Sequence, residues 1–260
     1  MDGPQCKVVL FGKTGDGKST VANALVTGGI EDLRFTIGHG VKGCTSQMLT
    51  LEGRGWTVTD TVGLGEGEGG QVSTEEAENL ILEFLKKVKG QYSHVIYVKS
   101  STNRFDVLDE TIWKSFQRIF KGAEGAFTVL FTKGKEEWLD TNYHNMPDWV
   151  KRDVGRENVF ITDIPPISDK KVRESRNQKV RVESVKKLET DLRGAFQRRG
   201  EQLSTPAICN MSDGELVDES KSILDYIMNL FSVSVRELSS LMSFVESVDN
   251  IVSVFAELFL

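Results

Sequence analysis

Residues 12–19 read GKTGDGKS and follow the apolar run 8–11, VVLF. They match the phosphate-binding pattern G-x-x-x-x-G-K-[ST], known as the P-loop. Three glycines would let the backbone curl so that its N–H groups point at phosphate oxygens. Lys18 would reach the β- and γ-phosphates, and the Ser19 hydroxyl would bind Mg²⁺. The pattern therefore predicts a site for a nucleoside triphosphate.

Two elements must position this loop. The apolar run with Lys7 predicts a buried strand over 7–11, and residues 19–25, STVANAL, predict the start of a helix with an apolar face. The amino end of such a helix adds positive potential where the phosphates would lie. We expect the whole loop and the residue after it to bind the nucleotide: Gly12, Lys13, Thr14, Gly15, Asp16, Gly17, Lys18, Ser19 and Thr20.

A second motif, D-x-x-G at residues 60–63, ends the predicted strand 56–60. This is the D-x-x-G motif of GTP-binding switch proteins. Here Asp60 would hold Mg²⁺ through a water, and the Gly63 N–H would bond to the γ-phosphate. This bond would be lost on hydrolysis, so the following segment would order and disorder with the nucleotide state. The Gly-rich run 64–70 suits such a segment.

With both motifs the chain resembles a GTPase. The segments DTVGLG, Phe131-Thr132-Lys133-Gly134 and Cys44-Thr45-Ser46 are similar to those of the immunity-associated nucleotide-binding family. That family includes the avirulence-induced plant GTPases and is related to chloroplast outer-envelope import GTPases and septins. The resemblance covers about residues 6–200. It implies a switch threonine that completes the Mg²⁺ shell; Thr45 matches best and Thr36 is the alternative. The implied metal-binding residues are thus Ser19, Thr45 and Asp60.

Guanine recognition normally uses [NT]-K-x-D after the next buried strand, where the carboxylate accepts both guanine N–H donors. In the family, a basic residue lies three positions before the acidic one, and Lys133 and Glu136 match this spacing. Lys133 would therefore stack on the base, and Glu136 would supply the carboxylate. If the pattern is aligned on Thr132 instead, Lys135 takes the acidic position. Asp163, after the last strand, is the nearest polar residue for the final base-contacting loop.

Hydrolysis is expected to be slow. Ras-like enzymes orient the attacking water with a Gln directly after D-x-x-G, and this chain has Leu64 there. Relatives without the Gln tend to dimerise across the nucleotide face, which completes a site in trans. His39, Glu66 and Glu68 are alternatives for positioning water, although each also fits an ordinary polar loop residue.

Strand-like and helix-like runs alternate along the chain, as in α/β proteins. We predict a P-loop GTPase (G) domain with a mostly parallel central sheet and helices on both faces at residues 1–202. Further strands are expected at 47–51, 94–98, 126–131 and 158–162, and helices at 73–88, 106–120 and within 168–199. A linker at 203–214 would lead to an amphipathic C-terminal helical segment at 215–260, whose apolar residues recur every three or four positions from Val235 to Phe259.

Composition restricts the partners. The net charge is −6, which disfavours nucleic acid as a partner. Three separated cysteines indicate a reducing compartment, and no signal peptide is recognised. We expect a cytoplasmic protein, with peripheral attachment to a membrane surface as the alternative. The C-terminal helices would fold back on the G domain, self-associate or lie on a membrane, although their acidic polar face suits anionic lipid poorly.

The expected ligands are GTP or GDP with Mg²⁺. The favoured function is a GTP-binding switch with slow hydrolysis, whose nucleotide state controls self-association, as a homodimer or oligomer, or partner binding. A P-loop ATPase or small-molecule kinase would fit the P-loop alone. A non-hydrolysing scaffold with structural nucleotide is the third alternative.

Overall fold

The computed structural model describes residues 5–29, 48–61, 74–167 and 170–230. Within these ranges the strands are β1 Cys6–Phe11, β2 Leu49–Gly53, β3 Trp56–Asp60, β4 His94–Ser100, β5 Phe127–Thr132 and β6 Val159–Thr162. They form one sheet in the order β2-β3-β1-β4-β5-β6. Only the β2–β3 pair is antiparallel, and the other four pairs are parallel. The predicted mostly parallel sheet is confirmed, with β1 at its centre.

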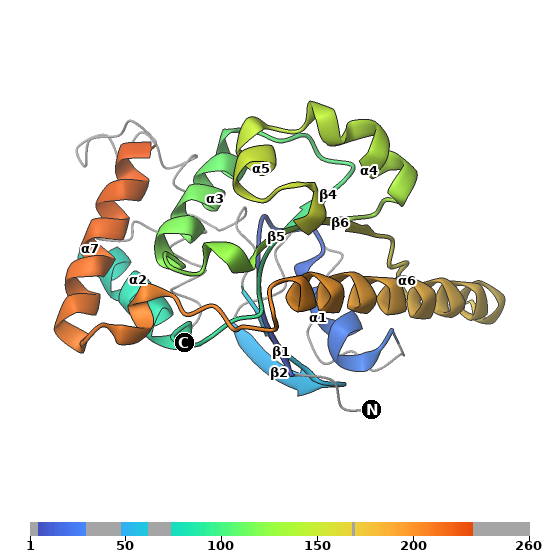
Figure 1. The fold of residues 1–260 in the computed structure, drawn as a ribbon, viewed down its shortest axis with the longest axis horizontal. Coiled ribbons are helices and arrows are strands. Elements are labelled where there is room, and N and C mark those ends of the chain that lie inside the picture. The colour runs from blue at the N-terminus through green and yellow to red at the C-terminus, as the bar shows by residue number, and fades with distance from the viewer. Residues whose placement is uncertain (1–4, 30–47, 62–73, 168–169, 231–260) are drawn as a thin grey trace.

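Helices cover both faces of the sheet (Figure 1). They are α1 Lys18–Thr27, α2 Thr74–Lys87, α3 Val107–Ile119, α4 Glu136–Asn142, α5 Asp148–Asp153, α6 Lys171–Arg198 and α7 Asp213–Leu230. Alternate residues of β1 divide between two hydrophobic cores, as the period of two in a strand requires. Val8 and Leu10 pack with α1 and α6, whereas Val9 and Phe11 lie in the core under α2, α3 and α7.

The segment predicted as a linker, 203–214, is bound to the rest of the fold. Tyr92 and Ser204 exchange two backbone hydrogen bonds, at 2.9 and 2.8 Å, and the Ala207 N–H donates to the Lys121 carbonyl at 2.7 Å. A 3₁₀ turn at Ala207–Asn210 follows. These contacts lead the chain across the molecule to α7.

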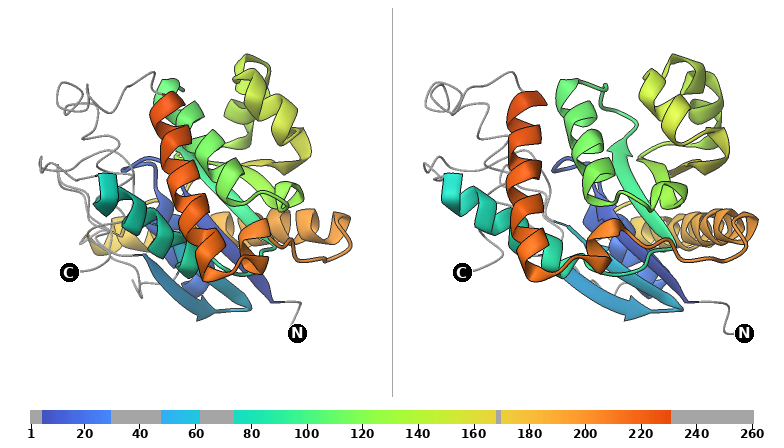
Figure 2. Two further views of the ribbon diagram at one scale, coloured as in Figure 1. Left: turned by 90° about the vertical axis from the view of Figure 1, so that its left-hand side faces the viewer. Right: turned by 60° about the vertical axis from the view of Figure 1, so that its left-hand side comes forward.

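Helix α7 packs on α2 and α3, outside the face that they cover (Figure 2). Leu216 and Ile223 are fully buried in the same core as α3. Arg118 of α3 donates to Glu219 and to Ser222 of α7, and its guanidinium lies 5.3 Å from the Tyr226 ring. The first part of the predicted C-terminal segment thus belongs to the core of the domain. The apolar stripe from Val235 lies outside the described residues.

Two helices were missing from the sequence-based expectation. Helices α4 and α5 are seven and six residues long. They bury few side chains, Leu139 on α4 and Trp149 and Val150 on α5, so no apolar period was long enough to detect. Helices α4 and α5 lie on the same face of the sheet as α3, because their buried side chains belong to the same hydrophobic core.

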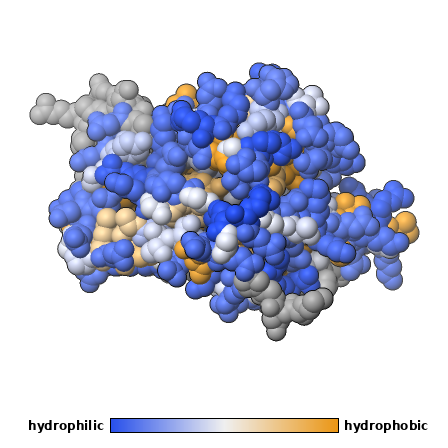
Figure 3. Space-filling model, in the orientation of Figure 1, coloured by the Kyte–Doolittle hydropathy of each residue, from blue (hydrophilic) through white to orange (hydrophobic). Residues whose placement is uncertain are grey.

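The face seen in Figure 1 is mainly hydrophilic, with hydrophobic residues in small separate groups (Figure 3). Within the described ranges, no helix is both long and apolar enough to cross a bilayer.

Candidate nucleotide-binding site

The loop between β1 and α1 can be built only from glycine at its first position. Gly12 has φ +139°, and a Cβ atom there would stand 2.3 Å from the Val98 carbonyl oxygen of β4. Gly15 and Gly17 have φ +80° and +96°, in the region that disfavours other residues. The loop lies at the carboxyl ends of the parallel strands, where ligands bind in open α/β sheets.

Lys18, the first residue of α1, is buried beneath this loop. Its Nζ donates hydrogen bonds to the carbonyl oxygens of Gly12 and Lys13, at 2.9 and 3.0 Å. Burial lowers the pKa of Lys18 to about 8, although Asp60 and Asp16 partly oppose this shift. The ammonium group is therefore held inside the curve of the loop, where it would meet phosphate oxygens.

Asp60, the last residue of β3, is fully buried next to this lysine. Burial raises its pKa to about 6, against the opposite effects of Lys18 and of the Ser19 hydroxyl. Apart from the Ser19 hydroxyl, neither carboxylate oxygen has a hydrogen-bond partner among the described residues. A buried carboxylate with so few partners is costly, and carboxylate and hydroxyl oxygens are the ligands that Mg²⁺ prefers. Asp60 and Ser19 therefore fit the predicted Mg²⁺ site.

The end of β5 also contacts the P-loop. The Thr132 hydroxyl donates to the Asp16 carbonyl at 2.7 Å, and Lys133 Nζ donates to the Gly15 carbonyl at 3.2 Å. Lys133 has φ +58°, which turns the chain sharply after the strand. The structure thus brings Lys133, which the sequence analysis placed beside the base, to the P-loop, together with Thr132, which the sequence analysis used only to align the motif.

Glu136, the carboxylate predicted to read the base, forms ion pairs with two cations from other elements. Its two oxygens are 3.3 Å from Nη2 of Arg156 and 3.1 Å from Nζ of Lys187. Arg156 precedes β6, so it lies toward the amino ends of the parallel strands, away from the nucleotide edge. In the free protein the Glu136 carboxylate is thus paired with two partly exposed cations.

Asp163 follows β6 directly, at the expected edge of the sheet. Its backbone carbonyl accepts a hydrogen bond from the Ser184 hydroxyl of α6 at 2.6 Å. Thr45, with its alternative Thr36, and Gly63 lie outside the described residues, as do Leu64, His39, Glu66 and Glu68.

The sequence analysis missed a buried charge cluster that fastens the P-loop to α3. Asp109 accepts hydrogen bonds from Lys99 Nζ at 2.9 and 3.0 Å, from the Tyr97 hydroxyl and from Lys13. Burial, together with the adjacent Asp109, raises the pKa of Tyr97 far above its usual value. The tyrosine therefore remains a hydrogen-bond donor.

The same cluster reaches Asp16 in the loop. Its Oδ1 accepts from Asn103 at 3.0 Å, and its Oδ2 lies 4.0 Å from Lys99 Nζ. A lysine in the otherwise apolar run HVIYVKS, and aspartates spaced D-x-x-D at 106 and 109, were the available signals. The second is a capping box, in which each aspartate accepts a hydrogen bond from the backbone N–H of the other.

Comparison with known proteins agrees with this architecture. The model of the AIG1 family matches residues 6–155, which is more than half of the chain.

Among solved structures, the chain is similar to Toc33 from Arabidopsis thaliana in complex with GDP and Mg²⁺, at 17% identity and a TM-score of 0.42, over 79% of this chain and 88% of that one. It is similar to an Era variant from Aquifex aeolicus bound to a GDP complex, at 15% identity and a TM-score of 0.42, over 61% of this chain and half of that one. A SAR1-type GTPase from Encephalitozoon cuniculi with GDP matches at 15% identity and a TM-score of 0.40, over 76% of this chain and 84% of that one.

The family match over residues 6–155 and the P-loop between β1 and α1 together show the family. The chain belongs to the AIG1 family, and its P-loop domain is a GTP-binding G domain of the AIG1 type.

Proposed function

We propose that this protein is a nucleotide-dependent switch that binds GTP with Mg²⁺ and hydrolyses it slowly. The observation that carries the proposal is the buried Asp60 carboxylate, whose neighbouring polar groups are only Lys18 and Ser19 among the described residues. In the free protein this arrangement costs stability, because Lys18 and Ser19 only partly offset the removal of a charged group from water. A bound cation and phosphates would supply the missing partners.

The residues act on the nucleotide as follows. The backbone N–H groups of the P-loop and the Lys18 ammonium bind the phosphates and stabilise the charge that develops on them. Lys18 is already positioned by two carbonyl groups, so little side-chain freedom is lost on binding. Ser19 and Asp60 would hold Mg²⁺, which neutralises charge on the phosphate oxygens.

Slow hydrolysis follows from the residue at position 64. A leucine side chain has no group that could orient a water molecule for attack on the γ-phosphate. A second copy of the chain, or a partner, would then have to supply that group. We therefore propose that the GTP-bound state favours self-association, and that association accelerates turnover.

A single-turnover assay across protein concentration tests this proposal. The hydrolysis rate per molecule should rise steeply with concentration and level off when sedimentation shows the dimer to be complete. Lys18→Ala should weaken GTP binding at least about a hundredfold, since a charge-assisted contact is lost. Lys179→Ala, at an exposed position of α6, is the matched control and should leave binding unchanged.

A rapid rate of tens per second in dilute monomer would refute slow hydrolysis. Binding without any turnover, even at high concentration, would favour the non-hydrolysing scaffold. A protein that binds ATP and does not bind GTP would favour the ATPase or kinase alternative.

A further inference from the structure

We infer that Lys135 occupies the position of the guanine-reading carboxylate, so that this site binds purine nucleoside triphosphates without selecting guanine over hypoxanthine or xanthine. The inference rests on the proposed nucleotide site and specifies which bases it accepts. It follows from three features of the segment between β5 and α4.

The alignment of this segment is fixed by contacts with the P-loop. Thr132 and Lys133 donate to consecutive residues of the loop, Asp16 and Gly15. The Thr132 side chain also fills the space beside Gly17, where a Cβ atom would lie 3.2 Å from its methyl carbon. These two residues therefore take the first two positions of the [NT]-K-x-D pattern, and the lysine stem lies where a base would stack.

Gly134 then holds the segment against the end of β6. Its N–H points to the Thr162 carbonyl at 3.4 Å, and the Ser101 hydroxyl donates to the Lys133 carbonyl at 2.9 Å. A Cβ atom on Gly134 would stand 2.6 Å from Ile161, so the backbone is packed closely here. The next residue, Lys135, therefore takes the fourth position of the pattern.

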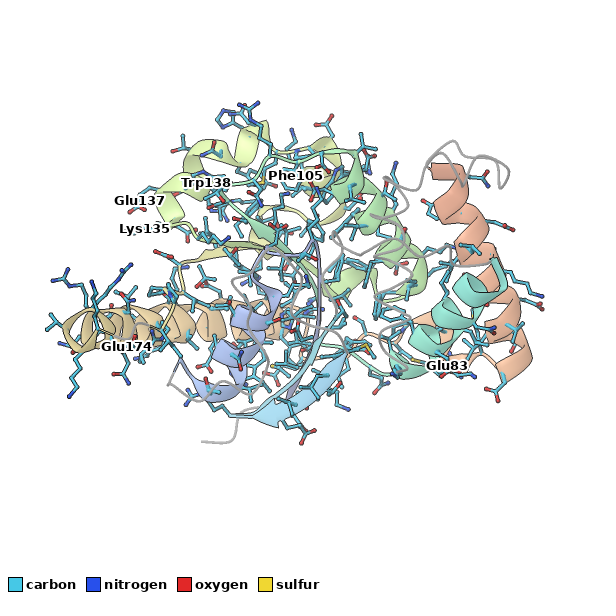
Figure 4. The ribbon with its side chains drawn as sticks, turned by 180° about the vertical axis from the view of Figure 1, so that it is seen from behind. Glu83, Phe105, Lys135, Glu137, Trp138 and Glu174 are labelled. Carbon is cyan, nitrogen blue, oxygen red and sulfur yellow. The ribbon has the colours of Figure 1, made fainter. Side chains whose placement is uncertain are left out.

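The Lys135 side chain is exposed, and Figure 4 shows it at the beginning of α4, between that helix and α6. The neighbouring Glu136 carboxylate is already paired with Arg156 and Lys187, so it would have to leave two ion pairs to replace Lys135. The residue at the fourth position of the pattern is thus a cation.

The chemistry of the base then decides the selectivity. Guanine presents an N1–H and a C2 amino group, which are hydrogen-bond donors, whereas the Lys135 ammonium is itself only a donor. Xanthine carries a carbonyl in place of the amino group and loses a proton near neutral pH, so it suits an adjacent cation. Hypoxanthine lacks the amino group and should lose nothing here. Sites that pair a donor on their substrate with an acceptor reject analogues strongly, and the fourth position of the pattern holds no acceptor here.

Calorimetric titration with GTP, ITP, XTP and ATP in Mg²⁺ at pH 7.5 tests the inference. In the wild type we expect GTP and ITP affinities within about threefold of each other, and XTP at least as tight as GTP. Lys135→Asp should strengthen GTP binding about tenfold or more and weaken XTP binding by a similar factor. Lys179→Asp makes the same charge change at an exposed position of α6 and should leave all ratios unchanged.

A wild-type preference of about thirtyfold or more for GTP over both ITP and XTP would overturn the inference, even if Lys135→Asp fails to fold. If Asp163→Asn then removed that preference, Asp163 would be the residue that reads guanine. If the wild type bound none of these triphosphates, the proposed nucleotide site would be overturned as well. The same would follow if the Lys18→Ala variant bound them as tightly as the wild type. The two failures are therefore distinguishable.

Discussion

At the scale of single residues, the buried Asp60 carboxylate lowers the stability of the free protein, and bound Mg²⁺ would relieve this cost. Asp60 is fully buried, and burial raises its pKa from 3.8 to about 6. The folded protein therefore binds a proton more tightly than the unfolded chain. This contribution to stability is complete below about pH 4 and is lost as the pH rises through about 6.

Asp60→Asn should accordingly stabilise the protein free of nucleotide and Mg²⁺. The difference between the two pKa values corresponds to about 3 kcal/mol at pH 7.5, and the gain should vanish near pH 4. Urea unfolding in the presence of EDTA at both pH values measures it. A loss of stability at pH 7.5 would mean that the contacts with Lys18 and Ser19 outweigh the cost of burying the carboxylate.

Gly12 tests how tightly the loop is built. Gly12→Ala would place a Cβ atom 2.3 Å from the Val98 carbonyl at a strained φ, which should destabilise the protein by about 3 kcal/mol and abolish nucleotide binding. Gly125→Ala is the matched control, since a Cβ atom there meets nothing within 4 Å. Thermal unfolding of the two variants compares them; equal melting temperatures would contradict the close approach of the loop to β4.

The sequence alone predicted the positions of residues that belong to short, continuous motifs. Gly12 to Ser19 and Asp60 occupy the places that their motifs predict, because strand, loop and helix follow each other directly. Glu136 was assigned a role from spacing alone, and its contacts come from Arg156 and Lys187, which are distant in sequence. The cluster of Lys99, Asp109 and Asp16 was equally invisible, because it joins three separate elements.

At the scale of elements, amphipathic period was a reliable signal for long helices only. It predicted α3 and α6 to within a few residues of their ends, whereas the short α4 and α5 offered no full period. It also could not tell that α7 packs on α2 and α3, since an apolar stripe does not name its partner.

Helix α7 should therefore contribute to the stability of the whole domain. Ile223 is fully buried in the core shared with α3, and Ile223→Ala should lower the free energy of unfolding by about 2–5 kcal/mol in a single transition. Val217→Ala, at an exposed position of the same helix, should change it by less than about 1 kcal/mol. If Ile223→Ala produced a separate early transition and left the main one unchanged, α7 would be an independent unit.

At the scale of the whole molecule, the sheet order brings the chemically important residues to one edge. The P-loop follows β1, Asp60 ends β3, and Thr132 and Asp163 mark the ends of β5 and β6. Because these strands are parallel, their carboxyl ends meet at one side of the sheet. Phosphate, metal and base would thus be bound by separate segments of a single edge, and α3 braces that edge through Lys13 and Asp109.

The measurement that tests this account most directly is calorimetric titration with GTP at pH 7.5, with Mg²⁺ and with EDTA, for the wild type and Asp60→Asn. We predict micromolar or tighter binding to the wild type, at least about tenfold weaker in EDTA, and an Asp60→Asn variant in which this dependence on Mg²⁺ is largely lost. Equal affinities with and without Mg²⁺ in the wild type, or an unchanged Mg²⁺ dependence in Asp60→Asn, would contradict the assignment of Asp60 to the metal site.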